Sequence, residues 1–289
     1  ARVLQVDSLE IKPNPKPAVR ILPVTIPPPS LGDQVADLER VADALSQRHG
    51  IAGGRADLPA LKALRLALRE GNWQISAALR GNELIAAYPE TGPPSTGLAV
   101  DVGTTKLALY LVDLISGQTL AAKGVMNPQI AYGEDVMSRL EAVMVDPAQA
   151  NQLQQDVVEA INTTAAELCD SQGITPTHLL DICLVGNTAM HHLLAGLPTR
   201  PLAVVPFVPA LSSPLDIHAR QLGLLAAPGA RVYLPPPIAG FVGSDHLAFL
   251  FLFDFVKDNH TKLGIDIGTN TEIALQVGEQ IVSCSTAFG

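Results

Sequence analysis

Two short stretches of this chain follow the same pattern, and they lie 165 residues apart, at Asp101 and Asp266. Each is an apolar run that ends in Asp and is followed by Gly, then by hydroxyl or amide side chains, then by a second apolar run. Glycine lets the turn backbone approach a phosphate, and Thr hydroxyls with successive N–H groups supply donors. An Asp at a strand end can hold a metal ion through water. The pair predicts two similar lobes with a nucleotide between them.

The candidate residues of this phosphate clamp come in two sets. The first turn consists of Asp101, Gly103, Thr104 and Thr105, with Lys106 beside it, and the second consists of Asp266, Gly268, Thr269 and Asn270. The alternative is two unrelated β-hairpins that use Gly in their turns. A hairpin gives no reason for a carboxylate at the same offset in an apolar strand, where an unpaired charge is costly. We therefore favour the clamp, with Asp101 and Asp266 as catalytic, metal-anchoring residues.

A third candidate lies midway between the turns, where a strand-like run stops at Gly186 and is followed by Asn187 and Thr188. A helix that begins there would direct its N-terminus at the phosphates or their metal. Asn and Thr are also preferred at helix starts, so plain capping is an equally good interpretation.

Gly243-Ser244-Asp245, at the start of an apolar helical run, has the same ambiguity. In a cleft, Asp245 would polarise a water or a hydroxyl near the terminal phosphate, which makes it a third catalytic candidate. In the first turn of a helix, it would instead interact with the helix dipole.

The composition bounds the class of protein. The chain has 289 residues, 47% of them hydrophobic and 16% charged, so it is long enough for two domains and should fold. Residues 97–289 carry 8 Lys and Arg against 18 Asp and Glu, a balance that should repel nucleic acid. An acidic lobe can still bind a nucleotide, because metal ions and backbone N–H groups neutralise phosphates.

Cysteines and hydropathy indicate the compartment. Cys169, Cys183 and Cys284 lie far apart without a Cys-x-x-Cys pair, which argues against an iron–sulfur cluster, a zinc site or a disulfide framework among them. The most apolar run, at 246–256, is short and contains Asp254, so it predicts a buried helix and no membrane span. We expect a reducing, cytoplasmic setting.

The chain divides into four predicted parts. They are a proline-rich, extended linker at 1–30, a small α+β middle domain at 31–92, a first α/β lobe at 93–262 and the start of a truncated second lobe at 263–289. Helices are expected after Ser30 and Asn187, from His246, and at 58–68, 134–143 and 147–171. Strands are expected at 73–79, 83–87, 98–102, 105–113, 118–125, 180–185 and 231–234. We expect a fragment, because a strand–turn–strand pattern has only begun again at the end.

Longer strings add a family resemblance. They are Asn127-Pro-Gln-Ile-Ala-Tyr-Gly-Glu-Asp135, Val185-Gly-Asn-Thr-Ala-Met-His-His192, Pro206-Phe-Val-Pro209, Ile238-Ala-Gly-Phe-Val-Gly243 and Cys284-Ser-Thr-Ala287. The two Asp-containing turns are similar to the phosphate motifs of the superfamily of acetate and sugar kinases, heat-shock chaperones and actin. Within it, the strings resemble the ATP-dependent reductive activators of corrinoid proteins, over practically the whole chain.

The resemblance implies a fold, an activity and partners. The fold is α/β, with ribonuclease H-like ATPase lobes. The activity is ATP-driven reduction of Co(II) to Co(I) in a corrinoid protein of a methyltransferase system, by a homodimer that uses ATP and Mg²⁺. Asp101 and Asp266 would anchor the Mg²⁺ through water. The electron would come from a [2Fe-2S] ferredoxin-like domain, whose cysteines these residues do not include.

Two other functions stay open. A small-molecule kinase for a sugar or a carboxylate needs an acid near the acceptor hydroxyl, for which Asp245 is the candidate. A non-enzymatic, nucleotide-gated scaffold needs only the two phosphate turns.

Overall fold

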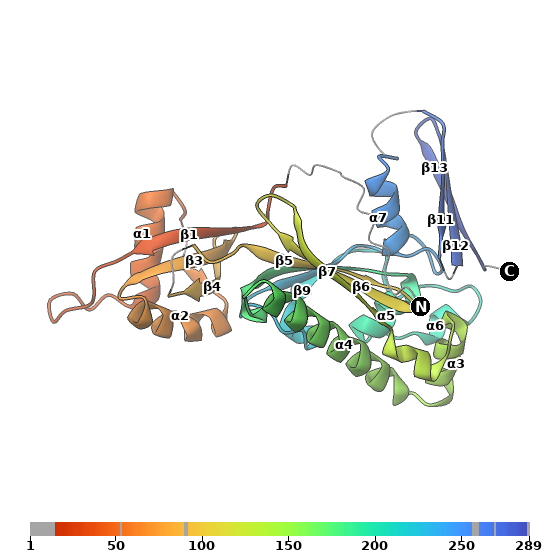
Figure 1. The fold of residues 1–289 in the computed structure, drawn as a ribbon, viewed down its shortest axis with the longest axis horizontal. Coiled ribbons are helices and arrows are strands. Elements are labelled where there is room, and N and C mark those ends of the chain that lie inside the picture. The colour runs from red at the N-terminus through yellow and green to blue at the C-terminus, as the bar shows by residue number, and fades with distance from the viewer. Residues whose placement is uncertain (1–14, 53, 90–91, 256–259, 269, 288–289) are drawn as a thin grey trace.

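The computed structural model describes residues 15–52, 54–89, 92–255, 260–268 and 270–287 (Figure 1). These residues form a small N-terminal sheet, a six-stranded central sheet and a three-stranded sheet near the C-terminal end. The first and the last sheet lie at opposite ends of the central one (Figure 1). Within the described ranges, no helix combines the length and apolar character needed to cross a membrane.

The N-terminal sheet has the strand order β1-β3-β4-β2, and two helices pack on it. Its elements are β1 (Val19–Thr25), α1 (Asp37–His49), β2 (Arg55–Ala56), α2 (Leu58–Glu70), β3 (Gln74–Arg80) and β4 (Glu83–Tyr88). Val41 and Leu45 of α1, with Leu64 and Leu68 of α2, form the buried helical faces of this small core.

Two features of this region differ from the sequence expectation. The first helix begins only at Asp37, because a bridge between Ser30 and Asp33 closes a turn before it. The segment Val19–Thr25 is extended, as expected of a connector, but it also pairs with β3 along its length. A proline is tolerated there because β1 lies at the edge of the sheet.

The central sheet has the strand order β7-β6-β5-β8-β10-β9. Its strands are β5 (Thr96–Val102), β6 (Lys106–Asp113), β7 (Thr119–Met126), β8 (Leu179–Val185), β9 (Leu215–His218) and β10 (Arg231–Leu234). Strands β5, β6 and β7 are antiparallel neighbours, whereas β8 and β10 run parallel to β5. This is the ribonuclease H-like arrangement of the actin, heat-shock chaperone and sugar kinase lobes, so the predicted fold class is confirmed.

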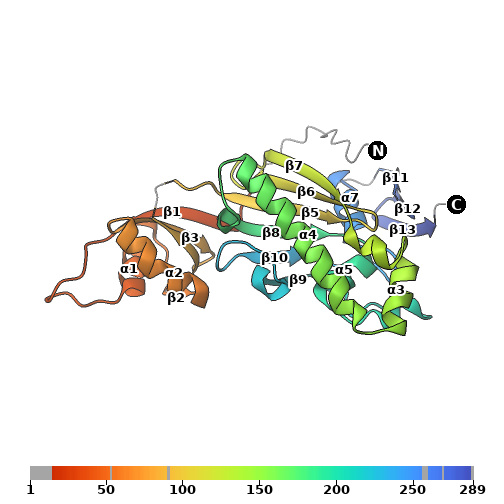
Figure 2. The same ribbon diagram turned by 60° about the horizontal axis from the view of Figure 1, so that its bottom comes forward.

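Helices cover the central sheet and complete its core. They are α3 (Val136–Val145), α4 (Gln149–Ser171), α5 (Thr188–Ala195) and α6 (Arg200–Ala203). Helix α4 crosses the sheet over β6 and β7 (Figure 2), where Leu153, Val157 and Ile161 are buried. Helix α5 packs on α4 and follows directly after β8, so the sheet fixes the position of its N-terminus.

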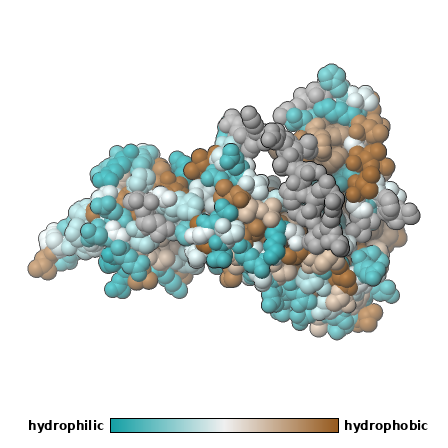
Figure 3. Space-filling model, viewed as in Figure 1, coloured by the Kyte–Doolittle hydropathy of each residue, from teal (hydrophilic) through white to brown (hydrophobic). Residues whose placement is uncertain are grey.

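The third sheet joins the rest of the molecule through α7 (Ser244–Leu252). It is antiparallel and consists of β11 (Lys262–Ile267), β12 (Asn270–Val277) and β13 (Gln280–Ala287). Phe249 of α7 packs so closely over Gly264 that a Cβ there would lie 2.7 Å from the ring. On the opposite face, Leu263, Ile265 and Ile267 are exposed, and hydrophobic surface gathers over this sheet at the upper right of Figure 3.

The apolar run at 246–256 is only partly the buried helix that we expected. Helix α7 ends at Leu252, and Phe251 is 80% exposed. His246 and Leu250 are buried, because they face the interior and the third sheet. Val256 lies outside the described residues.

Candidate nucleotide-binding site

The first turn joins β5 to β6, and three side chains hold it in place, two through backbone carbonyls and one through the Thr104 hydroxyl. Asn127 donates a hydrogen bond from Nδ2 to the Gly103 carbonyl (2.8 Å), and Asn187 donates one to Thr104 Oγ1 (2.9 Å). The fully buried Arg139 donates from Nη2 to the Thr104 carbonyl (2.5 Å). The first turn is therefore a supported loop whose peptide groups have fixed directions.

Two helices begin beside this turn. Asn187 caps α5 by accepting a hydrogen bond from the Met190 N–H, so one side chain serves both the cap and the turn. At the start of α7, the Ser244 N–H donates to the Gly186 carbonyl (2.9 Å). A Cβ on Gly243 would lie 2.3 Å from that carbonyl oxygen, so this approach requires glycine. Both N-termini carry partial positive charge, which favours a bound anion between them and the turn.

The second turn joins β11 to β12. The Gly268 N–H donates to the Asn270 carbonyl (2.9 Å), and Asp266 pairs in register with Glu272. Glu272 accepts a hydrogen bond from the Ser285 hydroxyl (2.8 Å). Thr269, a predicted phosphate-binding residue, lies outside the described residues.

Electrostatic interactions place the two turns and α7 around one cleft. Desolvation by the surrounding protein, and then repulsion by Asp266, raise the pKa of Asp101 to about 6. Part of the residue nevertheless keeps contact with solvent. Burial raises the pKa of Asp245 to about 7; a hydrogen bond from the His246 N–H opposes the rise, and repulsion by Asp101, Glu272 and Asp266 adds to it. Like charges act in this way only at short range. The structure thus brings Asp101, Asp245 and Asp266 together, while their chemical roles stay predictions.

The donor set at this cleft suits a hard cation. Carboxylate oxygens are the protein ligands that Mg²⁺ prefers, and a cation would relieve the repulsion that raises the pKa of Asp101. Asp101 and Asp266 are the side chains that would hold it. Among the described residues, no group of three or more His, Cys, Asp or Glu side chains forms a preassembled metal site.

A cavity of about 570 Å³ lies between the start of α5 and the third sheet, and its described lining does not include Asp101, Asp245 or Asp266. Asn187 and Thr188 line it from the start of α5, and Asn270 and Ser285 line it from the third sheet. Three predicted site residues therefore face one space from two sides.

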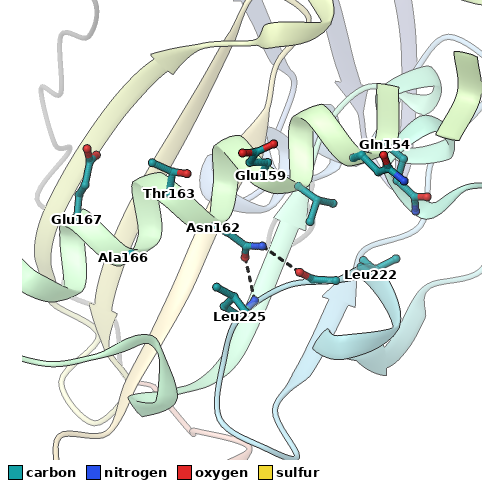
Figure 4. Close-up of a pocket in the computed structure, with 11 residues that line it drawn as sticks. Gln154, Glu159, Asn162, Thr163, Ala166, Glu167, Leu222 and Leu225 are labelled. Atoms are coloured by element: carbon teal, nitrogen blue, oxygen red, sulfur yellow. Dashed lines mark hydrogen bonds between the residues drawn. The ribbon is translucent and has the colours of Figure 1, made fainter. Parts of the chain in front are cut away.

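A second cavity, of about 710 Å³, lies along the outer side of α4 (Figure 4). Asn162 donates from Nδ2 to the Gly223 carbonyl (2.9 Å) and accepts from the Leu225 N–H (2.8 Å), which holds the loop against the helix. Its described lining contains none of the predicted site residues. The larger of these two cavities is therefore not the one that the predicted site residues line.

Comparison with known proteins gives the family. The family description "RACo middle region" matches residues 96–258, more than half of the chain. The chain belongs to the RACo family. A second description, "RACo linker region", matches residues 8–92. In RACo terms, the small α+β domain predicted at 31–92 therefore falls within the linker region. The four boundaries drawn from the sequence stay predictions.

Individual relatives agree with this assignment. The corrinoid activation enzyme RamQ of Eubacterium limosum is 30% identical over 222 residues, which are 76% of this chain and 37% of that protein. The [Co(II) methylated amine-specific corrinoid protein] reductase of Methanosarcina barkeri is 25% identical over 205 residues, or 67% and 36%. The solved structure of a reductive activator for corrinoid,iron-sulfur protein matches 98% of this chain and 46% of its own, with a TM-score of 0.81 and 29% identity. This RACo chain spans less than half the length of these relatives, and the resemblance predicted from the motifs is confirmed.

Sequence reasoning misses three residues of the site. Asn127 and Arg139 hold the first turn, and Glu272 adds a carboxyl group to the cleft. Asn127 is the first residue of one of the motifs that resemble the family. Glu272 lies two residues after Asn270 in the same strand, so it projects from the same face. Both could therefore have been predicted from the sequence. Arg139 leaves a weaker signal, a charged residue on the apolar face of α3.

Proposed function

We propose that this RACo chain forms the nucleotide-binding part of an ATP-dependent reductive activator of a corrinoid protein. The observation that carries the proposal is the repulsion by Asp266 that adds to the raised pKa of Asp101, although the sequence separates the two residues by 165 positions. Their cleft lies beside the N-termini of α5 and α7, where a triphosphate has donors and favourable charge. The names of the relatives support a corrinoid protein as the substrate.

ATP would lie between the two turns. Backbone N–H groups and hydroxyls of residues 103–106 and 268–270 would bind its phosphates. The helix start at 186–188 would add donors for the terminal phosphate. Asp101 and Asp266 would hold Mg²⁺ through water, and the ion would neutralise phosphate charge.

The proposed reaction adds one electron to Co(II), which becomes Co(I), and ATP is hydrolysed to ADP and phosphate. A [2Fe-2S] domain that is not among these residues would supply the electron. ATP can assist only by binding two states of the protein with different affinity. Closure of the cleft around ATP would change the contact with the corrinoid protein and displace a cobalt ligand, so that Co(II) becomes easier to reduce. A homodimer, a cytoplasmic setting and a methyltransferase system belong to the same proposal.

Asp245 supports a second candidate function. A carboxyl group with a pKa of about 7 in a phosphate cleft suits the acceptance of a proton from a hydroxyl, as a small-molecule kinase requires. In an activator, the same group would polarise the water that attacks the terminal phosphate. ATP consumption that depends on a sugar or a carboxylate would favour the kinase; dependence on a corrinoid protein would favour the activator.

The test measures Co(I) formation by its absorption spectrum, with the full-length protein, a corrinoid protein, an electron donor, ATP and Mg²⁺. Asp101→Ala and Asp266→Ala should abolish ATP-supported reduction and leave the circular dichroism spectrum unchanged. Asp170→Ala removes an exposed carboxylate of α4 and serves as the matched control, with full activity. Full activity of both cleft variants would overturn the proposal, and ATP binding without turnover would favour a scaffold.

A further inference from the structure

Arg139 is a cation buried beneath the first turn without an acidic partner. Its side chain is completely shielded from solvent. Its guanidinium donates to three oxygens and contacts one sulfur: the Gly133 carbonyl (2.9 Å), Gln129 Oε1 (3.2 Å), the Thr104 carbonyl (2.5 Å) and Met190 Sδ (3.3 Å). All four partners are neutral, and none of the described carboxylates is within ion-pair distance.

Burial of an unpaired charge costs folding free energy, and a second buried arginine of this chain shows how such a charge is usually paired. Arg40 is also buried, but Asp33 accepts its guanidinium in an ion pair at 2.6 Å. Burial lowers the pKa of Arg139 to about 10, while the charge of Asp135 partly opposes this, so the guanidinium is protonated at neutral pH. Buried Arg is normally paired, because desolvation of an isolated charge is unfavourable. Asp135 offsets this cost only from a distance, and an anion bound to the loop above would supply further negative charge close to the guanidinium.

The hydrogen bond to Thr104 also fixes the direction of a donor. In a planar trans peptide, the carbonyl of one residue and the N–H of the next point in opposite directions. Because the Thr104 carbonyl points at Arg139, the Thr105 N–H points away from it. Asn127 holds the Gly103 carbonyl in the same manner, which turns the Thr104 N–H outward as well. Two successive N–H groups with set directions form an anion-binding arrangement.

We propose that Arg139 is a positioning residue for phosphate binding, which orients the Thr104–Thr105 peptide and attracts the phosphates from beneath the loop. This inference rests on the proposed nucleotide site. Arg139 would act on the phosphates through the loop and would not contact the nucleotide itself. Substitution of Arg139 should therefore weaken phosphate binding and leave nucleoside binding unchanged.

The test compares ATP and adenosine binding to the full-length protein by calorimetry. Arg139→Met should weaken ATP binding about 10- to 100-fold, as expected for loss of a charged hydrogen-bond donor, and leave adenosine binding unchanged. Arg139→Lys, which keeps the charge but not the planar fork, should lose less. Arg40→Met removes a buried Arg far from the turn in the chain and should leave both affinities unchanged.

The unsubstituted protein provides a measurement that does not depend on the folding of a variant. The Nε nitrogen resonance of Arg139 should shift on addition of ADP and stay in place on addition of adenosine. Equal weakening of ATP and adenosine in Arg139→Met, or an Arg139 resonance that ignores ADP, would overturn the inference. If the unsubstituted protein binds no ATP, the proposed function fails instead.

Discussion

The two predicted phosphate turns share a sequence pattern, but their surroundings in the structure differ. The first is held by Asn127, Arg139 and Asn187, which reach it from three separate elements. The second turn lies between the paired strands β11 and β12, and its Gly268 N–H donates to the Asn270 carbonyl. Gly268 is exposed, whereas Thr104 is buried.

This difference predicts that the two turns contribute differently to nucleotide binding. A loop whose peptides are fixed before the ligand arrives loses little entropy on binding. In the proposed nucleotide site, the first turn is therefore the half whose peptides are held by side chains from other elements before the ligand arrives.

The largest expected effect comes from the glycines of the two turns. A Cβ on residue 103 would lie 2.6 Å from the Lys106 carbonyl oxygen, whereas one on residue 268 would lie 3.3 Å from the Asn270 carbonyl oxygen. Gly103→Ala should therefore weaken ATP binding by up to about 100-fold, since overpacking of a fixed loop cannot be relieved. Gly268→Ala should cost about fivefold or less. Equal losses, measured by calorimetry, would remove the distinction between the turns.

Most of this arrangement follows from the sequence, and the exceptions have physical reasons. Alternating apolar residues and Gly-containing turns predict β5, β6, β11 and β12, because those signals are local. The pairing of β1 with β3 is invisible locally, since the same extended residues also describe a free connector. Arg139 is missed for a related reason: on a helix, an Arg normally indicates the solvent side, and only the tertiary structure shows four neutral partners around it.

The next effect concerns His191 of α5, which lies one helical turn after the capping residue Asn187. Burial, with repulsion from His192, lowers the pKa of His191 to about 4, and among the described residues neither ring nitrogen has a hydrogen-bond partner. The folded protein thus binds fewer protons than the unfolded one between pH 6.5 and 4, so stability is full above pH 6.5 and lost as the pH falls.

His191→Leu should abolish the loss of stability that protonation of His191 in the unfolded chain causes at low pH. Its advantage in unfolding free energy over the unsubstituted protein should grow by about 2 kcal/mol between pH 7 and pH 5, as measured in urea. The raised pKa values of Asp101 and Asp245 act equally in both proteins and cancel in the difference. A difference that stays constant with pH would contradict a neutral, buried His191.

Asn187→Asp separates the two tasks of the shared cap. The carboxylate can still accept the Met190 N–H, so helix stability should change little. It would have to accept a hydrogen bond from the Thr104 hydroxyl in place of donating one, and it adds a negative charge beside the proposed phosphate site, so ATP affinity should fall about tenfold. Asn162→Asp, on the outer side of α4, is the control and should bind ATP normally. Unchanged ATP affinity in Asn187→Asp would show that the first turn needs no such support.

The smallest effect concerns the attachment of the second turn. Ser283 Oγ lies 3.0 Å from His246 Nε2, a hydrogen bond between β13 and α7. Ser283→Ala should destabilise the third sheet by about 1 kcal/mol and speed amide hydrogen exchange in β11–β13, with little change in the central sheet. Faster exchange throughout the chain would mean that the third sheet is not a separate, weaker unit.

A double-mutant cycle on Mg²⁺-ATP binding tests the central claim most directly, with Asp101→Asn, Asp266→Asn and the two combined in the full-length protein. If both carboxylates hold one ion, each single change removes nearly all of the Mg²⁺-dependent affinity, and the double variant binds no worse, with a coupling energy above about 1 kcal/mol. Losses that simply add, or an Asp266→Asn variant that binds like the unsubstituted protein, would contradict a shared site.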